Sequence, residues 1–155
     1  MSKIKIKNFG PIKQTCIDND GWIDIKKVTV FVGNQGSGKS TVAKLLSTFM
    51  WIEKALIRGD YSKEWFEEKD RLKSQYLNYH RLENYFKMNG HEKAVLDYQG
   101  DAYSIRYEND SFILEENAGY TYNLPQIMYV PAERNFISYV KTPKELKLSS
   151  DSLKE

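Results

Sequence analysis

The hydrophobic and polar positions in the first half of the chain predict three strands followed by one helix. Residues 3–7 and 22–26 alternate charged and apolar side chains with a period of two, which is typical of strands that expose one face to solvent. Residues 28–32 are an unbroken run of β-branched and aromatic side chains, which predicts a central parallel strand covered on both faces. From residue 40 to just before Gly59 the apolar spacing becomes three and four, which predicts an amphipathic helix. Its apolar face carries Val42, Leu45, Phe49, Ile52 and Leu56.

The second half of the chain predicts a helical insertion, an antiparallel meander and one more buried strand. Aromatic and leucine side chains recur at a loose helical spacing between about residues 60 and 90, which predicts one long or two short surface helices. Four short strand patterns separated by turn residues then predict a meander over about residues 93–123. These patterns cover residues 93–98, 102–108, 111–116 and 120–123. The apolar run at 127–130 ends at Pro131 and predicts a strand that leads into a helix at 133–140.

Composition predicts a soluble, cytoplasmic, folded chain. Its 155 residues suit one domain, and 41% hydrophobic and 28% charged residues are ordinary proportions. No run approaches the roughly 20 apolar residues of a membrane span, so no membrane partner is expected. The formal net charge of +2 neither indicates nor excludes nucleic-acid binding. Cys16 is the only cysteine, which excludes an internal disulfide and a cysteine-rich zinc site, and the first residues show no secretory pattern.

A phosphate-binding loop is the most specific motif of the chain. Residues 33–40 read Gly-Asn-Gln-Gly-Ser-Gly-Lys-Ser and match the P-loop, or Walker A, pattern G-x-x-x-x-G-K-S. The predicted strand before the loop and the predicted helix after it supply the context that this pattern requires. Gly33, Gly36 and Gly38 allow consecutive backbone N–H groups to converge on phosphate oxygens without Cβ interference. The loop therefore predicts a site for a nucleoside triphosphate.

Each polar residue of the loop has a predicted task. Lys39 is expected to place its charge between the β- and γ-phosphates and is the one predicted catalytic residue. Ser40 is the predicted metal ligand, through its hydroxyl on Mg²⁺, and Thr41 is expected on the α-phosphate side. ATP and Mg²⁺ are the expected cofactors. The predicted nucleotide-binding residues are Gly33, Asn34, Gln35, Gly36, Ser37, Gly38, Lys39, Ser40 and Thr41.

The residues that would complete a hydrolytic site are harder to place. Hydrolysis needs a second acid to orient the metal and a Glu or Gln to position the attacking water. Apolar runs end at Asp97 and at the pair Glu115 and Glu116, but both runs lie in the predicted meander, where solvent-facing acids at strand ends are the favoured interpretation. Residues 149–152 resemble an L-S-x-G-E signature only faintly, because the glycine is missing. No catalytic base is assigned.

Residues 131–135 are a further candidate region. They close a predicted strand and open a predicted helix, the position at which α/β sheets place ligand-binding groups. Arg134 is a candidate for contacting phosphate, and Glu133 for contacting the metal or its water. An ordinary helix start with an acid in its first turn explains the same residues equally well.

Three motifs together resemble the N-terminal lobe of an ABC-type ATPase of the RecF, SMC and OLD-like group, which contains an AAA ATPase domain. The motifs are the strand end at 6–12, the loop at 33–41 and the strand end at 127–134. The similarity covers roughly residues 1–140, although only the loop is specific by itself. It implies an α/β P-loop NTPase core with an N-terminal β ribbon, central parallel strands, the antiparallel meander and the helical insertion. Residues 141–155 would then be a polar tail or a truncation point.

The resemblance also implies a mode of action. Asn8 and Phe9 would lie near the edge of the nucleotide, and ATP would be sandwiched between the lobes of two subunits, each completed by a second lobe. The sequence departs from the family pattern, because Ala132 stands where a Q-loop glutamine is usual and no second lobe is recognised. The chain is therefore expected to bind Mg-ATP, to turn it over slowly alone and to form a homodimer in the ATP state. A DNA partner and a role in DNA repair or phage defence rest on family analogy alone.

Two other functions stay open. A small-molecule P-loop kinase would need an arginine-rich lid, whereas Arg71, Arg81 and Arg106 are scattered without lid spacing. A non-hydrolysing scaffold that uses nucleotide to fix its conformation would bind through the same loop. Phosphoryl transfer to a metabolite would indicate the kinase, and binding without any turnover would fit the scaffold.

Overall fold

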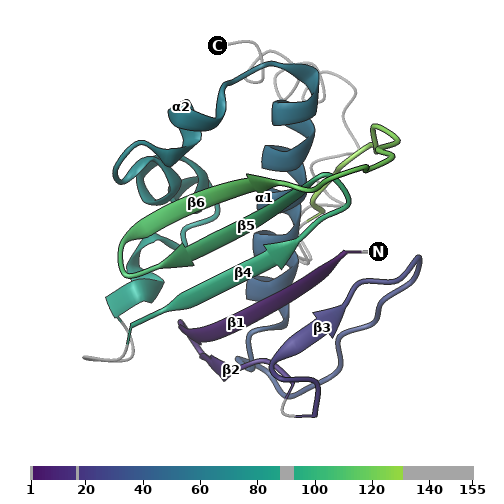
Figure 1. The fold of residues 1–155 in the computed structure, drawn as a ribbon. Helices are drawn as coiled ribbons and strands as arrows, with labels where there is room; N and C mark the ends of the chain where they lie inside the picture. The colour runs from purple at the N-terminus through teal and green to yellow at the C-terminus, as the bar shows by residue number, and fades with distance from the viewer. Residues whose placement is uncertain (1, 17, 88–92, 131–155) are drawn as a thin grey trace, which may run out of the picture.

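The structure is a mixed α/β arrangement in which one antiparallel sheet packs against one long helix (Figure 1). The computed structural model describes residues 2–16, 18–87 and 93–130. The strands are β1 (Lys3–Phe9), β2 (Ile12–Gln14), β3 (Trp22–Asp24), β4 (Val95–Gln99), β5 (Tyr103–Glu108) and β6 (Ser111–Glu116). The helical segments are α1 (Lys39–Arg58), α2 (Lys63–Glu67), the π-helix η1 (Leu72–Leu77) and the 3₁₀-helix η2 (Glu83–Lys87). The predicted helix at 133–140, the tail at 141–155 and the candidates Glu133 and Arg134 lie outside the described residues.

The predicted N-terminal ribbon and the predicted meander form a single sheet. Its strand order is β2-β1-β4-β5-β6, with β3 also paired to β1, and the pairs are antiparallel. Strand β1 joins the two parts, since it pairs with β4 from Lys3 opposite Gln99 to Lys7 opposite Val95. The period of two in β1 is confirmed, because Ile4 and Ile6 are fully buried while the lysines lie on the open face. A half-covered sheet therefore forms the base on which the helix packs.

Helix α1 confirms the predicted amphipathic helix and crosses behind the sheet (Figure 1). Leu45, Phe49 and Ile52 on its apolar face are all fully buried. The helix ends at Gly59, whose φ of +70° suits glycine, with Gly59 N–H donating to Leu56 O and Asp60 N–H donating to Ala55 O, both at 3.0 Å. Neither α1 nor any other helix of the described residues is long and apolar enough to cross a membrane.

The helical insertion is present but broken into the three short segments α2, η1 and η2. Ser62 caps α2 by accepting the N–H of Trp65 at 3.3 Å, and Asp70 and Arg81 have positive φ values of 61° and 57°, which interrupt any continuous helix. Segment α2 packs on β6, η1 on α1 and η2 on β1, through buried side chains in and beside these segments. These side chains are Phe66, Leu72, Leu77 and Leu82.

Residues 28–32 do not form the predicted buried strand. They lead to the loop without strand pairing, and Val28, Val30 and Val32 are 78%, 75% and 91% exposed. The side chains between them, Thr29 and Phe31, are half-buried. A parallel strand needs neighbouring strands and cover on both faces, and the described residues cover only one face of this segment.

Two further strand predictions are wrong for the described residues. The pattern at 120–123 stays irregular, because Asn117 caps the end of the hairpin by donating to Gly100 O at 3.1 Å and Gly119 turns the chain away with φ of +65°. Residues 127–130 are also unpaired, with Met128 83% and Val130 54% exposed. Their alternation of half-buried and exposed side chains repeats that of residues 28–32.

Candidate nucleotide site

The predicted loop lies between the exposed segment 28–32 and the first turn of α1. Gly36 and Gly38 have φ values of +77° and +94°, in a region that glycine enters without strain. Ser37 N–H donates to Asn34 O at 3.2 Å, and Val42 N–H donates to Gly38 O at 3.0 Å, so the turn of the loop continues directly into the helix. Residues 33–37 are exposed, which leaves the backbone of the loop open to a ligand.

The ammonium group of Lys39 folds over the loop. It donates to Gly33 O at 2.8 Å, to Asn34 O at 2.6 Å and to Ser37 Oγ at 3.4 Å. Two of the three N–H donors of the ammonium are used in the short bonds to backbone carbonyls, and these bonds fix the position of the group. The bond to Ser37 is long, so a phosphate oxygen can replace it at little cost in free energy.

The first turn of α1 is open to an anion. Its N-cap is Gly38, which offers no side-chain cap, and the first turn holds no acidic residue. The N–H groups of that turn and the positive end of the helix dipole are thus free of competing carboxylates. Ser40 is exposed in this turn, whereas Thr41 is only 5% exposed. The loop and Ser40 therefore fit a phosphate group with a bound Mg²⁺, and Thr41 faces the interior.

The turn between β1 and β2 packs directly on the loop. An added Cβ on Gly38 would meet Ile12 Cγ1 at 2.5 Å and Pro11 Cγ at 3.5 Å. Of the residues that the resemblance places at the nucleotide edge, Asn8 adopts a positive φ of 53° and Phe9 is fully buried. Pro11 and Ile12 pack against the loop at Gly38, and sequence reasoning missed this contact. The Gly-Pro pair after a strand was the available signal.

Alanine at Gly38 is expected to destabilise the fold more than alanine at Gly36. Both glycines have positive φ, so each substitution costs about 1 kcal/mol of unfolding free energy from backbone strain. Only Gly38 lacks space, since nothing lies within 4 Å of an added Cβ at Gly36, and overpacking costs a further 1–3 kcal/mol, roughly. Urea unfolding of the two variants measures this difference. Equal unfolding midpoints would contradict the contact between Gly38 and Ile12.

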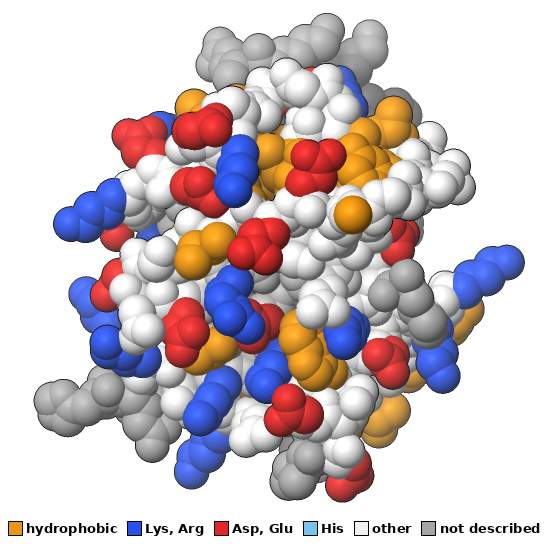
Figure 2. Space-filling model, in the orientation of Figure 1, with side chains coloured by type: hydrophobic (Ala, Val, Ile, Leu, Met, Phe, Trp, Pro, Cys, Tyr) orange, Lys and Arg blue, Asp and Glu red, His pale blue; other side chains and the backbone are white. Residues whose placement is uncertain are grey.

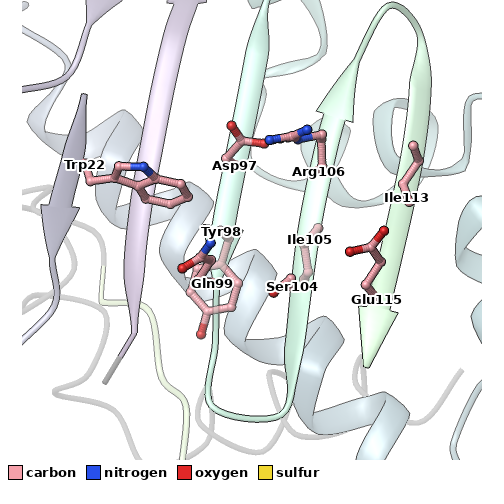
Figure 3. A pocket seen from close by; sticks show the side chains of 9 residues that line it. All are labelled: Trp22, Asp97, Tyr98, Gln99, Ser104, Ile105, Arg106, Ile113 and Glu115. Atoms are coloured by element: carbon pink, nitrogen blue, oxygen red, sulfur yellow. Dashed lines mark hydrogen bonds and ion pairs between the residues drawn. The ribbon is translucent and has the colours of Figure 1, made fainter. Parts of the chain in front are cut away.

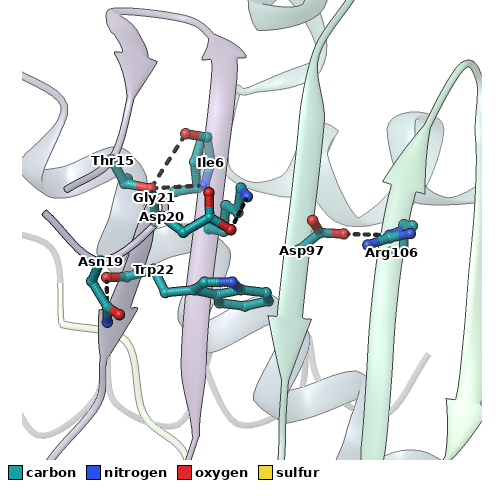
Figure 4. A network of polar contacts seen from close by, with 9 residues as sticks. Ile6, Thr15, Asn19, Asp20, Gly21, Trp22, Asp97 and Arg106 are labelled. Carbon is teal, nitrogen blue, oxygen red and sulfur yellow. Dashed lines mark hydrogen bonds and ion pairs between the residues drawn. The ribbon is translucent and has the colours of Figure 1, made fainter. Parts of the chain in front are cut away.

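The acids that end strand patterns do not face the loop. Asp97 and Glu115 lie on the face of the sheet opposite α1, and Asp97 accepts from Arg106 Nε at 2.7 Å (Figure 4). Glu116 is exposed at the end of β6. Within the described part of the chain, no carboxylate is hydrogen-bonded or ion-paired to the loop, and no three His, Cys, Asp or Glu side chains gather around a metal-sized space. The structure thus assigns none of these acids to hydrolysis.

The open face of the sheet carries a hollow of about 230 Å³ (Figure 3). Trp22 of β3 lies over β1 toward Asp97, and Gln99, Ser104 and Glu115 border the other side. Acidic and basic side chains are mixed over this face, with no large area of one charge (Figure 2). Trp22, Asp97 and Arg106 of the hollow's lining belong to one cross-strand row, in which Lys5 of β1 stands between Trp22 and Asp97. We interpret this hollow as part of the solvent-exposed face of the sheet, and its lining contains no residue of the loop.

The three arginines considered for a kinase lid lie apart from one another in the described residues. Arg71 stacks over the Trp65 ring at 4.2 Å and pairs with Glu68 in the insertion. Arg106 is held by Asp97 on the open face of the sheet. Arg81 is exposed in the turn after η1. These positions on different elements give no support to the kinase alternative.

Helix α1 also fixes the segment 125–130. Lys54 Nζ donates to Pro125 O at 2.6 Å, and the His80 ring packs edge-on against Tyr129 with 5.2 Å between the centroids. His80 is in turn held on α1, because its carbonyl accepts from Lys44 Nζ at 2.9 Å. Burial, and then the charge of Lys44, lower the pKa of His80, so the ring is neutral at pH 7. The segment therefore runs along α1 toward its first turn.

Comparison with known proteins identifies the family. No curated protein and no solved structure shows significant similarity to the chain. The family described as AAA ATPase domain matches residues 1–99, which are more than half of the chain and include β1, the loop, α1 and β4. Because the match contains the loop and its flanking elements, the chain belongs to the AAA ATPase domain family of nucleotide-binding ATPases.

Proposed function

We propose that residues 33–41 bind Mg-ATP. The observation that carries this proposal is the conformation of the loop, in which Lys39 Nζ lies over the Gly33 and Asn34 carbonyls beside an uncapped helix N-terminus. Backbone N–H groups and one fixed cation are the groups that recognise the β- and γ-phosphates of a nucleotide. The family membership supports ATP as the nucleotide.

The residues of the loop divide the work of binding. Lys39 neutralises charge on the terminal phosphates, and the N–H groups of the first turn of α1 orient them. Ser40 would hold the metal through its exposed hydroxyl. Mg²⁺, when bound, offsets the charge that develops between the β- and γ-phosphates.

We further propose that the chain is lobe one of an ABC-type ATPase of the RecF, SMC and OLD-like group. Residues 28–32 end at the loop, and residues 125–130 run along α1 from Lys54 toward Lys44, so both segments lead to the same end of the helix. Each segment exposes a row of apolar side chains, which supports further protein on that side. These side chains are Val28, Val30, Val32, Met128 and Val130.

On this proposal, hydrolysis requires groups beyond the described residues. No described carboxylate pairs with the loop, and Asp97 is engaged by Arg106 on the far face of the sheet. A second lobe and a second subunit in the ATP state would bring the acid, the water-positioning group and the cover for the apolar rows. Action on DNA, in repair or phage defence, is proposed from the family resemblance alone.

Binding and phosphate release test the proposal together. ATP and ADP should bind in the presence of Mg²⁺, whereas AMP, which lacks the phosphates that Lys39 contacts, should bind at least tenfold more weakly, a difference of about 1.4 kcal/mol. Isothermal titration with each nucleotide, repeated with EDTA, measures this. AMP binding as tightly as ATP would contradict phosphate recognition by the loop.

The isolated chain is expected to release phosphate far more slowly than about 1 s⁻¹, the lower end of typical enzyme turnover. The physical reason is that no carboxylate of the described residues is hydrogen-bonded or ion-paired to the loop. A phosphate-release assay with Mg-ATP measures the rate. Turnover at a normal ATPase rate, lost in Lys39→Ala, would show that this chain carries its own catalytic acid.

A further inference from the structure

The helical insertion touches the turn that closes on the loop. Gly10 lies in that turn with φ of +54°, and its N–H donates to the carbonyl of Tyr85 in η2 at 3.1 Å. An added Cβ on Gly10 would overlap the Tyr85 ring atoms Cδ2, Cε2 and Cγ. Backbone bonding and ring contact therefore both fix the position of the turn relative to η2.

Segment η2 is itself anchored on the sheet. Phe86 lies 4.9 Å from Phe9 and 4.8 Å from Tyr107 of β5, measured between ring centroids. Tyr85 adds a third ring contact to Phe9 at 5.6 Å, and Tyr85 N–H donates to Leu82 O at 3.0 Å. Leu82 is only 1% exposed, so the start of η2 is held in the core. The Tyr85 ring is thus a fixed support behind the turn.

The other side of the turn meets the nucleotide loop. Pro11 and Ile12 leave no room for a side chain on Gly38, the residue that caps α1 immediately before Lys39. Tyr85 thus packs on Gly10, and two residues further along the same turn Ile12 packs on Gly38, so the backbone from Gly10 to Ile12 links the insertion to the loop. Tightly packed segments transmit small displacements, since protein interiors have few voids to absorb them.

We propose that Tyr85 is a positioning residue of the nucleotide site, which holds the Gly10–Pro11 turn against Gly38 and thereby sets the conformation of the loop. The helical insertion then acts on nucleotide binding through the turn between β1 and β2. This inference rests on the proposed function for its effect on Mg-ATP. Its effect on the loop itself is independent of any nucleotide.

Hydrogen exchange without nucleotide gives the first test. Tyr85→Ala should accelerate amide exchange in peptides covering residues 8–14 and 33–41 while leaving β5 and β6 protected, because a local opening releases only the turn and the loop packed on it. Tyr85→Phe should exchange at the wild-type rates, because it keeps the ring and because the hydrogen bond from Gly10 N–H is accepted by the backbone carbonyl of residue 85. Tyr79→Ala is the matched control, because Tyr79 is 80% exposed in the same insertion and its ring contacts His80.

Mg-ATP affinity gives the second test. Tyr85→Ala should weaken Mg-ATP binding about three- to tenfold, whereas Tyr85→Phe should leave the affinity unchanged. The losses of binding free energy in Tyr85→Ala and Ile12→Ala should not add in the double variant, because both side chains act through Gly38. If Tyr85→Ala fails to fold, Tyr85→Leu replaces it. Unchanged exchange in 33–41 and unchanged affinity would overturn the inference. Faster exchange in a protein whose parent binds no Mg-ATP would instead uphold the positioning role and refute the proposed function.

Discussion

Replacing Lys39 with alanine is expected to abolish measurable Mg-ATP binding and to leave the fold intact. A charged hydrogen bond to phosphate contributes about 1.5–3 kcal/mol, so its loss weakens binding by roughly 10- to 150-fold before any loosening of the loop is counted. Lys39 contributes little to folding, because its three hydrogen bonds are at the exposed surface of the loop. Isothermal titration and urea unfolding of the same sample separate the two effects.

Two further variants isolate the charge of Lys39. Lys39→Met keeps the length of the aliphatic stem and removes the ammonium, so it should lose binding as Lys39→Ala does. Lys7→Ala removes the same charge from the open face of the sheet and should bind Mg-ATP normally. An unchanged affinity in Lys39→Met would mean that phosphate is held elsewhere and would remove the basis of the site assignment.

Local patterns were sufficient where the interactions that form an element are local. The loop, the helix from Lys39 to Arg58 and its end at Gly59 follow from spacing and glycine placement within a few residues. Strands β4, β5 and β6 follow likewise from alternation and from turns at Gly100 and Asn109. Each of these predictions needed only neighbours in sequence.

Predictions that depended on distant partners were incomplete. The pairing of β1 with β4 joins residues about 90 positions apart, and no alternation pattern encodes it. Residues 28–32 carry the composition of a buried strand, yet Val30 is 75% exposed because the described residues supply cover on one face only. The contact of Tyr85 with Gly10 is similarly remote in sequence, so its place behind the nucleotide loop required coordinates.

Sequence reasoning also missed a buried acid on α1. This acid directly follows Ile52, and the apolar spacing gave no sign that a charged side chain there would be buried. Glu53 is only 2% exposed and accepts three hydrogen bonds. Oε1 accepts the N–H groups of Ala102 at 2.7 Å and Tyr103 at 3.0 Å, and Oε2 accepts Tyr98 O–H at 3.0 Å. Glu53 thereby ties the P-loop helix to the turn between β4 and β5, where Gly100 leaves no room for a Cβ beside the carboxylate.

Glu53→Ala is expected to cause a large loss of stability. It leaves two backbone N–H groups and the Tyr98 hydroxyl buried without their acceptor, and each unsatisfied group costs about 1–3 kcal/mol. A total loss of at least about 3 kcal/mol would lower the melting temperature by roughly 6–12 °C or more. Thermal unfolding measures this, with Glu83→Ala as the control, since Glu83 lies in η2 away from this turn. A loss below about 1 kcal/mol would contradict the role of Glu53 in joining helix and sheet.

Glu53→Gln separates the hydrogen bonds from the charge. Glutamine keeps an acceptor for Ala102 and Tyr103, so most of the stability should remain at pH 7.

Burial raises the pKa of Glu53 despite the opposing hydrogen bonds from Ala102, Tyr103 and Tyr98. A raised pKa in the folded state stabilises the native protein below the unfolded value, and this contribution is lost as pH rises through the folded value. Wild type should therefore lose stability relative to Glu53→Gln as pH increases from about 4 upward, and urea unfolding at several pH values measures the difference. A difference that is constant with pH would show that the carboxylate ionises as easily in the folded protein as in the unfolded chain.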